Sequence, residues 1–291
     1  MSTQTLTVTD AHHKTRLDVF LTKSIGADFS RTFFKHLIEQ NLVSVNGEAV
    51  SVHHKVRAGD TVTVSISEPE EEEPLRAEDI LLHILYEDEY LLAVDKPAGM
   101  LAHPARGQKT GTLVNALLHH CPKLSNANTD ERAGIVHRLD RETSGVILVA
   151  KDNQTHIRLS RMFKKHRIQK KYVALVKGKV EFDEGKIDVP LGRDKDYFDK
   201  RAVSNGPNAR EAQTFYRVLT RSGSHCRVAL FPRTGRTHQL RVHMSWLGHP
   251  ILGDARYGGP SFKRLALHAQ SIAFEHPIKK FRLEISIPAP F

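Results

Sequence analysis

The sequence predicts an α+β protein with two unequal domains, and three observations lead to this prediction. The first 67 residues combine two amphipathic helical patterns with short alternating strands. Residues 68–79 are strongly acidic and include two prolines. Residues 80–291 contain several short apolar runs bounded by turn residues, which is the pattern of strands, and few helical segments. A chain of 291 residues is long enough for this division.

Two helices and a hairpin are predicted in residues 1–67. RLDVFLTKSI and RTFFKHLIEQ each place apolar residues on one helical face, and Ser30 stands at the N-cap position of the second segment. The pair Asn46-Gly47 predicts a hairpin, and AGDTVTVSI predicts a closing strand. Arg31 and Lys35 fall on the outer face of the second helix. The predicted inner residues are Leu17, Phe20, Leu21 and Ile25 in the first helix and Phe33, Phe34, Leu37 and Ile38 in the second.

Charge is distributed unevenly along the chain. The net charge is +10, yet residues 1–67 hold seven basic and six acidic residues, and residues 68–79 hold seven acidic residues and one arginine. Residues 80–291 therefore carry a net charge of +15. The acidic run Glu68–Pro74 is predicted to be an extended linker because its like charges repel one another. A basic domain behind such a linker indicates a polyanionic partner, either RNA or DNA.

Several classes of protein are disfavoured. No stretch approaches the ~20 consecutive apolar residues that span a bilayer, and the first residues lack the apolar centre of a signal peptide. Cys121 and Cys226 are far apart and form no CxxC motif. The loop GQKTGT lacks the GK[ST] ending of a nucleotide-binding loop, and the histidines lack metal-ligand spacing. We expect a cytoplasmic monomer that uses no metal ion or small-molecule cofactor and contacts no membrane.

The stretch AGIVHRLDRETSGVILVAK holds a cluster of charge between two apolar runs. The runs Gly134–Val136 and Val146–Ala150 are predicted to be buried strands, so the charged residues fall in a loop between them. Asp140 in this loop is a candidate nucleophile, because a carboxylate that an arginine holds in place can attack an electrophilic carbon. A solvated turn with a surface ion pair is the alternative. A serine triad of His137, Asp140 and Ser144 is disfavoured because no GxSxG motif occurs.

A basic run follows this loop. Residues 153–180 contain nine lysines and arginines and no acidic residue. Solvated helix faces usually mix the two signs of charge, so we interpret this run as a surface that contacts phosphates. The RNA-contact residues predicted within it are Lys164, Lys165, Arg167, Lys170 and Lys171.

Four motifs together resemble one enzyme family. GIVHRLDRETSGVILVAK resembles the signature of the RluA-type ribosomal large-subunit pseudouridine synthases, and YEDEYLLAVDKPAGMLAHP, KKYVALVKG and TGRTHQLRVHMSWLGHPILGDARYGG resemble its further motifs. They occur in the family's order over residues 81–291, and GTLVNALLHHCP with AGIVHRLD is most similar to the RluD branch. The helix–helix–hairpin order of residues 1–67 resembles a small RNA-binding domain of a ribosomal small-subunit protein and several RNA-modifying enzymes.

The resemblance implies roles for single residues. Asp140 in HRLD matches the catalytic aspartate of the family, and Tyr172 matches the tyrosine that contacts the target base and is proposed to abstract the final proton. Arg241 matches the arginine that pairs with the catalytic carboxylate. Arg138 matches a residue that in some relatives pushes into the RNA as the uridine leaves the stack. Arg236 and His238 of the last motif complete the predicted RNA contacts.

The resemblance also implies the fold and the reaction. We expect a small RNA-binding domain (1–67), an acidic linker (68–79) and a catalytic domain (80–291) with a mostly antiparallel mixed sheet flanked by helices. The expected reaction converts uridine to pseudouridine, most of all in large-subunit (23S) ribosomal RNA, with tRNA as the other substrate class. Two alternatives remain: an RNA-binding assembly factor without activity, and an N-glycosidase, which would need a second carboxylate such as Glu142 to activate water.

Overall fold

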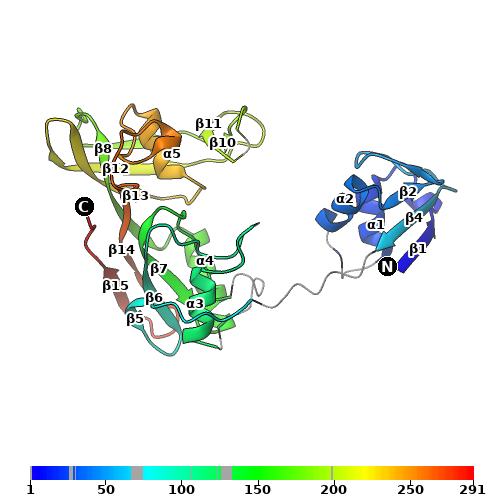
Figure 1. Cartoon of the computed structure of the whole chain (residues 1–291), viewed down its shortest axis with the longest axis horizontal. Coiled ribbons are helices and arrows are strands. Elements are labelled where there is room, and N and C mark those ends of the chain that lie inside the picture. Colours follow the sequence, from blue (N-terminus) through cyan, green and yellow to red (C-terminus); the bar gives the residue numbers. More distant parts are fainter. Residues whose placement is uncertain are drawn as a thin grey trace. The chain divides into compact units, whose positions relative to one another are not determined.

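The computed structural model describes residues 2–25, 29, 31–66, 75–105, 107–122, 124–125, 133–197 and 199–291. The chain divides into two compact units, Met1–Pro74 and Leu75–Phe291 (Figure 1). Ser30, the predicted N-cap, and the predicted linker run Glu68–Pro74 lie outside the described residues. Within the described ranges, no helix combines the length and the apolar character needed to cross a membrane.

The first unit is a four-stranded antiparallel sheet covered by two helices. Its strands follow the order β1-β4-β2-β3. Their bounds are β1 Ser2–Thr7, β2 Val43–Val45, β3 Glu48–Ala49 and β4 Thr61–Ile66, and the helices are α1 Leu17–Ile25 and α2 Arg31–Glu39. Strand β1 was not predicted, because its sequence STQTLT contains one large apolar residue and therefore lacks the alternating pattern of a half-buried strand.

The core of this unit joins both helices to the sheet. The predicted inner residues Leu17, Phe20 and Leu21 of α1 and Phe34, Leu37 and Ile38 of α2 are buried against the alternating valines of β4. Asn46 and Gly47 both have positive φ angles, 53° and 85°, as a two-residue type I′ hairpin turn requires. The Asn46 side chain also accepts a hydrogen bond from the Thr61 amide and donates one to Asp60, both at 2.9 Å, so the predicted turn is tied to the start of β4.

The second unit is built on one mixed sheet with the order β5-β6-β7-β14-β8-β13-β12-β9, and β15 also pairs with β14. The only parallel pair that the structure records among these strands joins β7 to β14. The predicted mostly antiparallel mixed sheet is thereby confirmed. The strand bounds are β5 His83–Glu87, β6 Leu91–Lys96, β7 Ser144–Ala150, β8 Gln169–Lys177, β9 Glu184–Asp188, β12 Gln213–Arg221, β13 His225–Pro232, β14 Leu267–Glu275 and β15 Arg282–Ser286.

Three helices flank this sheet at different places: α3 Leu113–His120, α4 Asn153–Lys164 and α5 Gln239–Trp246 (Figure 1). Strand β7 is buried along its whole length, because α3 packs on one of its faces and α4 on the other. Leu117 of α3 belongs to the cluster that contains Ile147, whereas Leu159 of α4 belongs to the cluster that contains Leu148. Alternate side chains along β7 therefore pack into two separate cores, one on each face of the sheet.

Residues 75–79 differ from the sequence-based prediction of a linker. Leu75 packs against the apolar cluster around α3, and the Glu78 amide donates a hydrogen bond to the Asn115 carbonyl at 3.0 Å. The Asn115 side chain in turn donates to the Arg76 carbonyl at 2.9 Å. The charge of this segment suggested a continuation of the linker, but its backbone bonds attach it to the second unit.

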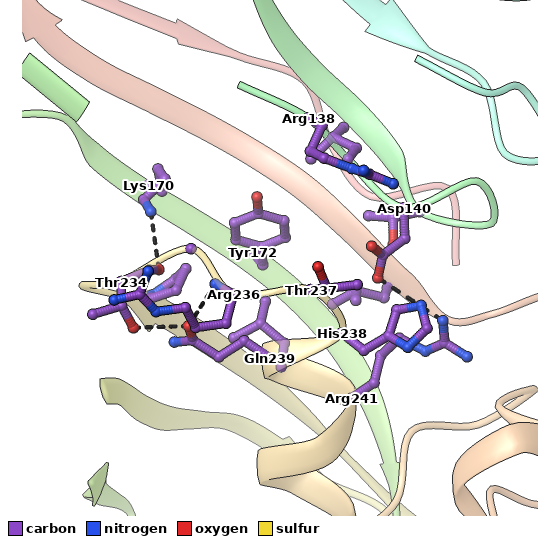
Figure 2. A pocket seen from close by; sticks show the side chains of 16 residues that line it. Arg138, Asp140, Lys170, Tyr172, Thr234, Arg236, Thr237, His238, Gln239 and Arg241 are labelled. Carbon is purple, nitrogen blue, oxygen red and sulfur yellow. Dashed lines mark hydrogen bonds and ion pairs between the residues drawn. The ribbon is translucent and has the colours of Figure 1, made fainter. Parts of the chain in front are cut away.

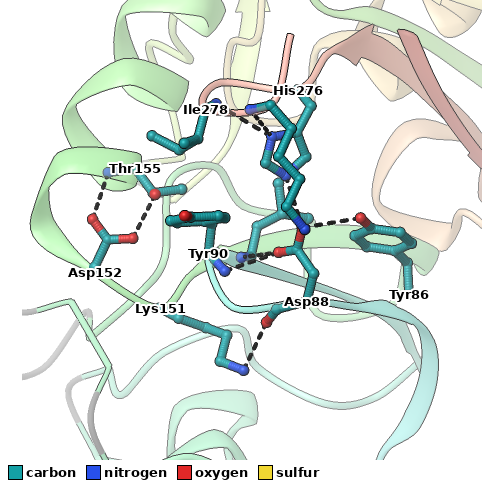
Figure 3. A network of polar contacts seen from close by, with 10 residues as sticks. Tyr86, Asp88, Tyr90, Lys151, Asp152, Thr155, His276 and Ile278 are labelled. Atoms are coloured by element: carbon teal, nitrogen blue, oxygen red, sulfur yellow. Dashed lines mark hydrogen bonds and ion pairs between the residues drawn. The ribbon is translucent and has the colours of Figure 1, made fainter. Parts of the chain in front are cut away.

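A polar network fixes the turn between β5 and β6 (Figure 3). One carboxylate oxygen of Asp88 accepts hydrogen bonds from the amides of Tyr90 and Leu91, and the other lies 3.0 Å from both His276 Nε2 and Lys279 Nζ. Burial opposes ionisation of this carboxyl, yet the hydrogen bonds from the two amides, from Lys279 and from Tyr86 together outweigh it and hold the pKa of Asp88 well below its usual range. The network connects this turn to the turn between β14 and β15.

Candidate active site

A cavity of about 110 Å³ opens in the second unit where three segments meet (Figure 2). These are the loop from Arg138 to Thr143, the first half of β8, and the stretch from Pro232 through the start of α5. Seven of the residues predicted from the sequence line it, although they come from three separate motifs. They are Arg138, Asp140, Lys170, Tyr172, Arg236, His238 and Arg241.

The loop that carries Asp140 is held by Lys96, whose side chain is fully buried at the end of β6. Its ammonium donates hydrogen bonds to the carbonyls of Pro97, Met100 and Arg141 at 2.7, 2.9 and 3.1 Å. Burial lowers the pKa of Lys96 to about 8, and the charges of Glu142 and Asp140 oppose this shift. Lys96 stands in the quoted DKPAG motif, but its contact with the Asp140 loop could not be read from the sequence.

The segment before Asp140 is attached to β7 by backbone and side-chain hydrogen bonds. Gly134–Val136 does not form the predicted strand; Ile135 makes a single bridge with Val149. The pairing does not continue past this bridge because the Leu148 amide donates its hydrogen bond to a side chain and not to a backbone carbonyl. The acceptor is His137 Nε2, at 2.8 Å. Burial and the charge of Lys170 lower the pKa of His137 to about 3, which keeps this ring neutral.

A glycine directly after the loop allows β14 to approach β7. Gly145 has a φ angle of 113°, and a Cβ atom placed on it would lie 2.2 Å from the Ala269 carbonyl oxygen. Any other residue would therefore be strained and would push the two parallel strands apart. The close approach lets the Asp140 loop and the β8 residues, which pair with β14, face the same cavity.

Lys170 and Tyr172 project from the same face of β8, because they are two residues apart. In Figure 2 the Tyr172 ring is seen between Lys170 and Asp140. Burial, together with the negative charge of Asp140, raises the pKa of Tyr172 above its ordinary value, so the resting side chain is a protonated phenol at neutral pH. The Lys170 ammonium donates to the Thr234 carbonyl at 3.2 Å, and burial lowers the pKa of Lys170 to about 8.

Arg241 contacts Asp140 but is bound much more tightly to another carboxylate. Its Nη1 lies 3.8 Å from Asp140 Oδ2, whereas Nε and Nη2 each donate to Asp254 at 2.7 Å. The Asp254 side chain is 1% exposed, against 19% for Asp140. The expected pair of Arg241 with Asp140 is thus the weaker half of a carboxylate–guanidinium–carboxylate arrangement. Asp254 lies in the quoted ILGDARYGG segment, but no spacing rule linked it to Arg241.

Two further side chains enclose Arg241. The ring of Tyr257 has its centroid 5.1 Å from the Arg241 guanidinium carbon, and its hydroxyl lies 2.8 Å from His238 Nδ1. His238 begins α5 in a left-handed conformation with a φ angle of 57°. Burial lowers the pKa of His238, and the charge of Asp140 opposes the shift. These contacts fix the side of the cavity on which Asp140 and Arg241 meet.

The other predicted RNA-contact residues are not among those that line this cavity. Lys164, Lys165 and Arg167 are exposed at the end of α4 and in the turn before β8, and Lys171 alternates to the opposite side of β8 from Tyr172. Arg31 and Lys35 belong to the first unit, where both side chains are engaged. Arg31 donates to the buried Asp18 at 2.8 Å, and Lys35 lies 3.5 Å from Glu39.

The described residues offer no cluster of three histidine, cysteine or acidic side chains that could hold a metal ion. The adjacent histidines His119 and His120 contact acidic residues instead: His119 lies 3.5 Å from Asp79 and His120 lies 2.9 Å from Glu87. His243 contacts Thr214 and the Val189 carbonyl inside the fold. Within the described ranges these histidines therefore have structural partners.

A carboxylate, a phenol and several cations surround one small cavity, on a basic sheet domain preceded by a small helix–sheet unit, and this combination is typical of an enzyme that modifies RNA. The chain belongs to the RNA pseudouridylate synthase family, which it matches over residues 90–246, and it matches the S4 domain over residues 15–62. It is thus an isomerase with an RNA-binding S4 domain. The resemblance inferred from the four motifs is confirmed.

Named relatives are similar over nearly the whole chain. The uncharacterized RNA pseudouridine synthase YlyB of Bacillus subtilis (strain 168) is 41% identical over 98% of this chain and 94% of its own length. Ribosomal large subunit pseudouridine synthase D of Vibrio parahaemolyticus is 41% identical over 98% of this chain and 91% of its own length. The structure of human RNA pseudouridylate synthase domain containing 1 is 28% identical, with a TM-score of 0.61, and covers 74% of this chain and 86% of the human chain.

Proposed function

We propose that this enzyme converts specific uridines of large-subunit ribosomal RNA to pseudouridine and that Asp140 carries the reaction. The substrate is supported by relatives named ribosomal large subunit pseudouridine synthase D, and by a catalytic unit whose sequence is strongly basic. The observation that carries the assignment of Asp140 is the cavity itself. Asp140 and Tyr172, which are 32 positions apart, line it together with Arg241.

The chemistry accounts for this set of residues. The N1–C1′ bond of uridine breaks, the base turns, and a C5–C1′ bond forms while C5 loses its hydrogen and N1 gains one. Atoms and electrons balance within the nucleotide, so no oxidant or group donor enters. Whether Asp140 attacks C1′ or removes the hydrogen from C2′, the step needs an unprotonated carboxylate beside the ribose. Arg241 Nη1 lies 3.8 Å from Asp140 Oδ2, so its guanidinium can hold this carboxylate in position beside the ribose.

Tyr172 and Arg138 have separate roles in the proposal. Tyr172 packs against the target base, and its raised pKa means that it must pass its phenolic proton on before it can abstract the hydrogen from C5. Arg138 is exposed at the cavity beside Asp140, where it can fill the stack that the uridine leaves. Extruding a base costs a few kcal/mol, which phosphate contacts can offset.

The N-glycosidase alternative lacks support at its required second carboxylate. Glu142 is exposed, lies 4.0 Å from Arg141, and does not line the cavity. Asp254 is the other nearby carboxylate, and both of its oxygens bind Arg241. Neither is placed to activate water at the ribose. For the alternative of an inactive assembly factor, Asp140, Tyr172 and Arg241 are all present and share the cavity, which favours an active enzyme.

The test compares Asp140→Asn with Glu142→Gln, a neighbouring carboxylate outside the cavity. Tritium release from ribosomal RNA labelled at uridine C5 measures the loss of the C5 hydrogen, and mapping of pseudouridines in cells with and without the gene identifies the target. We expect Asp140→Asn to abolish release while its RNA affinity stays within a few fold, because phosphate contacts dominate affinity. Normal release by Asp140→Asn would refute the assignment of Asp140.

The proposal includes a cytoplasmic monomer. Light scattering after size-exclusion chromatography and fractionation of cells that express a tagged protein test these two points.

A further inference from the structure

A second and larger cavity adjoins the proposed active site. It has a volume of about 950 Å³ and shares Gly235, Arg236 and Thr237 with the first cavity. Its other walls come from the short ribbon of β10 (Leu191–Arg193) and β11 (Arg201–Val203) and from residues 204–210. We call it the arginine groove, because the charged residues that the structure describes in its lining are all arginines: Arg193, Arg201, Arg210 and Arg236.

Two of these arginines are direct cross-strand partners. Arg193 of β10 lies opposite Arg201 of β11 in the antiparallel register, so both side chains project from the same face of the ribbon. Like charges in this position destabilise a strand pair. Neither aspartate nor glutamate is among the described residues that line the groove. The described lining therefore carries positive charge alone, which indicates that the ligand of the groove is anionic.

Two acidic residues of the connecting turn, Asp194 and Asp199, have partners outside the lining of the groove. Asp194 accepts hydrogen bonds from the amides of Asp196 and Tyr197, at 3.0 and 3.2 Å. Asp199 forms an ion pair of 2.8 Å with Arg256. These carboxylates shape the turn between β10 and β11 and do not line the groove.

The ribbon is attached to the machinery of the first cavity. Leu191 and Val203 pack with Val242 of α5 and with Tyr257, in a small apolar cluster. The Tyr257 hydroxyl accepts a hydrogen bond from the Arg201 amide at 3.1 Å, and the same tyrosine covers Arg241. The groove is thus held at a set position beside Asp140, so a ligand in it can be continuous with a nucleotide in the first cavity.

We infer that the arginine groove binds the phosphodiester backbone of the RNA strand next to the target uridine. Guanidinium groups match the geometry of phosphate oxygens. None of the described residues that line the groove has an aromatic ring on which a base could stack. The groove should therefore position the RNA independently of its sequence, while the choice of uridine depends on other contacts. This inference rests on the proposed function and names the part of the substrate that the groove holds.

The test uses the full chain with Arg193→Gln/Arg201→Gln and a matched control, Lys109→Gln/Lys263→Gln, which removes two charges from exposed residues outside both cavities. Fluorescence anisotropy measures the Kd for a ribosomal RNA fragment that contains the mapped uridine and its flanks, at several salt concentrations. We expect the groove variant to bind about 10–100-fold more weakly than the control. The slope of log K against log salt should fall by about 1.5 relative to the control, because two phosphate contacts are lost.

Two further measurements separate binding from folding. If the arginines were structural, the groove variant would melt below the wild type; we expect an equal or higher Tm, since a like-charge pair is removed. A second RNA keeps the target uridine but lacks the flanking nucleotides whose backbone would lie in the groove. The groove variant and the control should have equal Kd values for this shorter RNA.

Equal Kd values and salt slopes for the groove variant and the control would overturn the inference. So would an acidic peptide that binds the wild type and not the variant while RNA binds both equally, because the groove would then serve a protein partner. Absence of tritium release by the wild type on every ribosomal RNA would instead reject the proposed function.

Discussion

The two carboxylates around Arg241 lead to a quantitative prediction about its replacement. Arg241→Ala removes both 2.7 Å bonds to Asp254 and leaves that carboxylate, which is 1% exposed, without its cation. Breaking a buried pair in this way costs about 3–5 kcal/mol of unfolding free energy. Arg241→Lys keeps the charge and one bond but loses the planar fork, so we expect a loss of about 1–2 kcal/mol.

The double variant Arg241→Ala/Asp254→Asn separates stability from catalysis. Because it no longer buries an unpaired charge, it should be more stable than Arg241→Ala alone, with a cost of about 1–3 kcal/mol for the buried amide that remains. Its isomerase activity should not recover and should stay about 10²-fold below the wild type, since Asp140 has lost the group that positions it. Urea unfolding followed by circular dichroism and tritium release measure the two quantities. If the double variant were no more stable than Arg241→Ala, the unpaired Asp254 carboxylate would not be the cause of the lost unfolding free energy.

Three further predictions follow from other contacts. Lys96→Met leaves three buried carbonyls without their donor, and we expect it to lower both the Tm and the rate of tritium release, whereas exposed Lys263→Met should change neither. Asp88→Asn should lower the unfolding free energy by about 2–4 kcal/mol at pH 7. The pKa of Asp88 in the folded protein lies below the unfolded value of about 3.9. The contribution of Asp88 to the unfolding free energy is therefore complete above about pH 3.9 and is lost as the pH falls toward the folded pKa. The unfolding free energies of the variant and the wild type should become equal in acid, and a difference that stays constant with pH would contradict this. Removal of residues 1–74 should leave a folded isomerase. We expect it to bind long ribosomal RNA about 10²–10⁴-fold more weakly than the full chain, and a short stem-loop with almost the same affinity. An equal loss of affinity for both RNAs would mean that the first unit does not bind RNA separately.

Features that depend on neighbouring residues could be predicted from the sequence. The inner faces of α1 and α2 and the hairpin at Asn46-Gly47 follow from local periodicity and turn chemistry. The mostly antiparallel mixed sheet of the second unit was expected from the resemblance of the four motifs to the family. The motifs also identified Asp140, Tyr172 and Arg241 as a set. Their common place in one cavity follows from the sheet, which brings β7, β8 and the start of α5 together.

The contacts between charged side chains, in contrast, are known only from the three-dimensional structure. Asp254 binds Arg241, Lys96 holds the Asp140 loop, and Arg193 faces Arg201 across a ribbon whose strands have three residues each. Sequence patterns report which face of a segment is apolar, but a charged side chain leaves no periodic signal that names its partner. Residues 75–79 show the same limit: their acidic composition indicated a linker, whereas backbone hydrogen bonds to Asn115, which depend on position and not on composition, attach them to the catalytic unit.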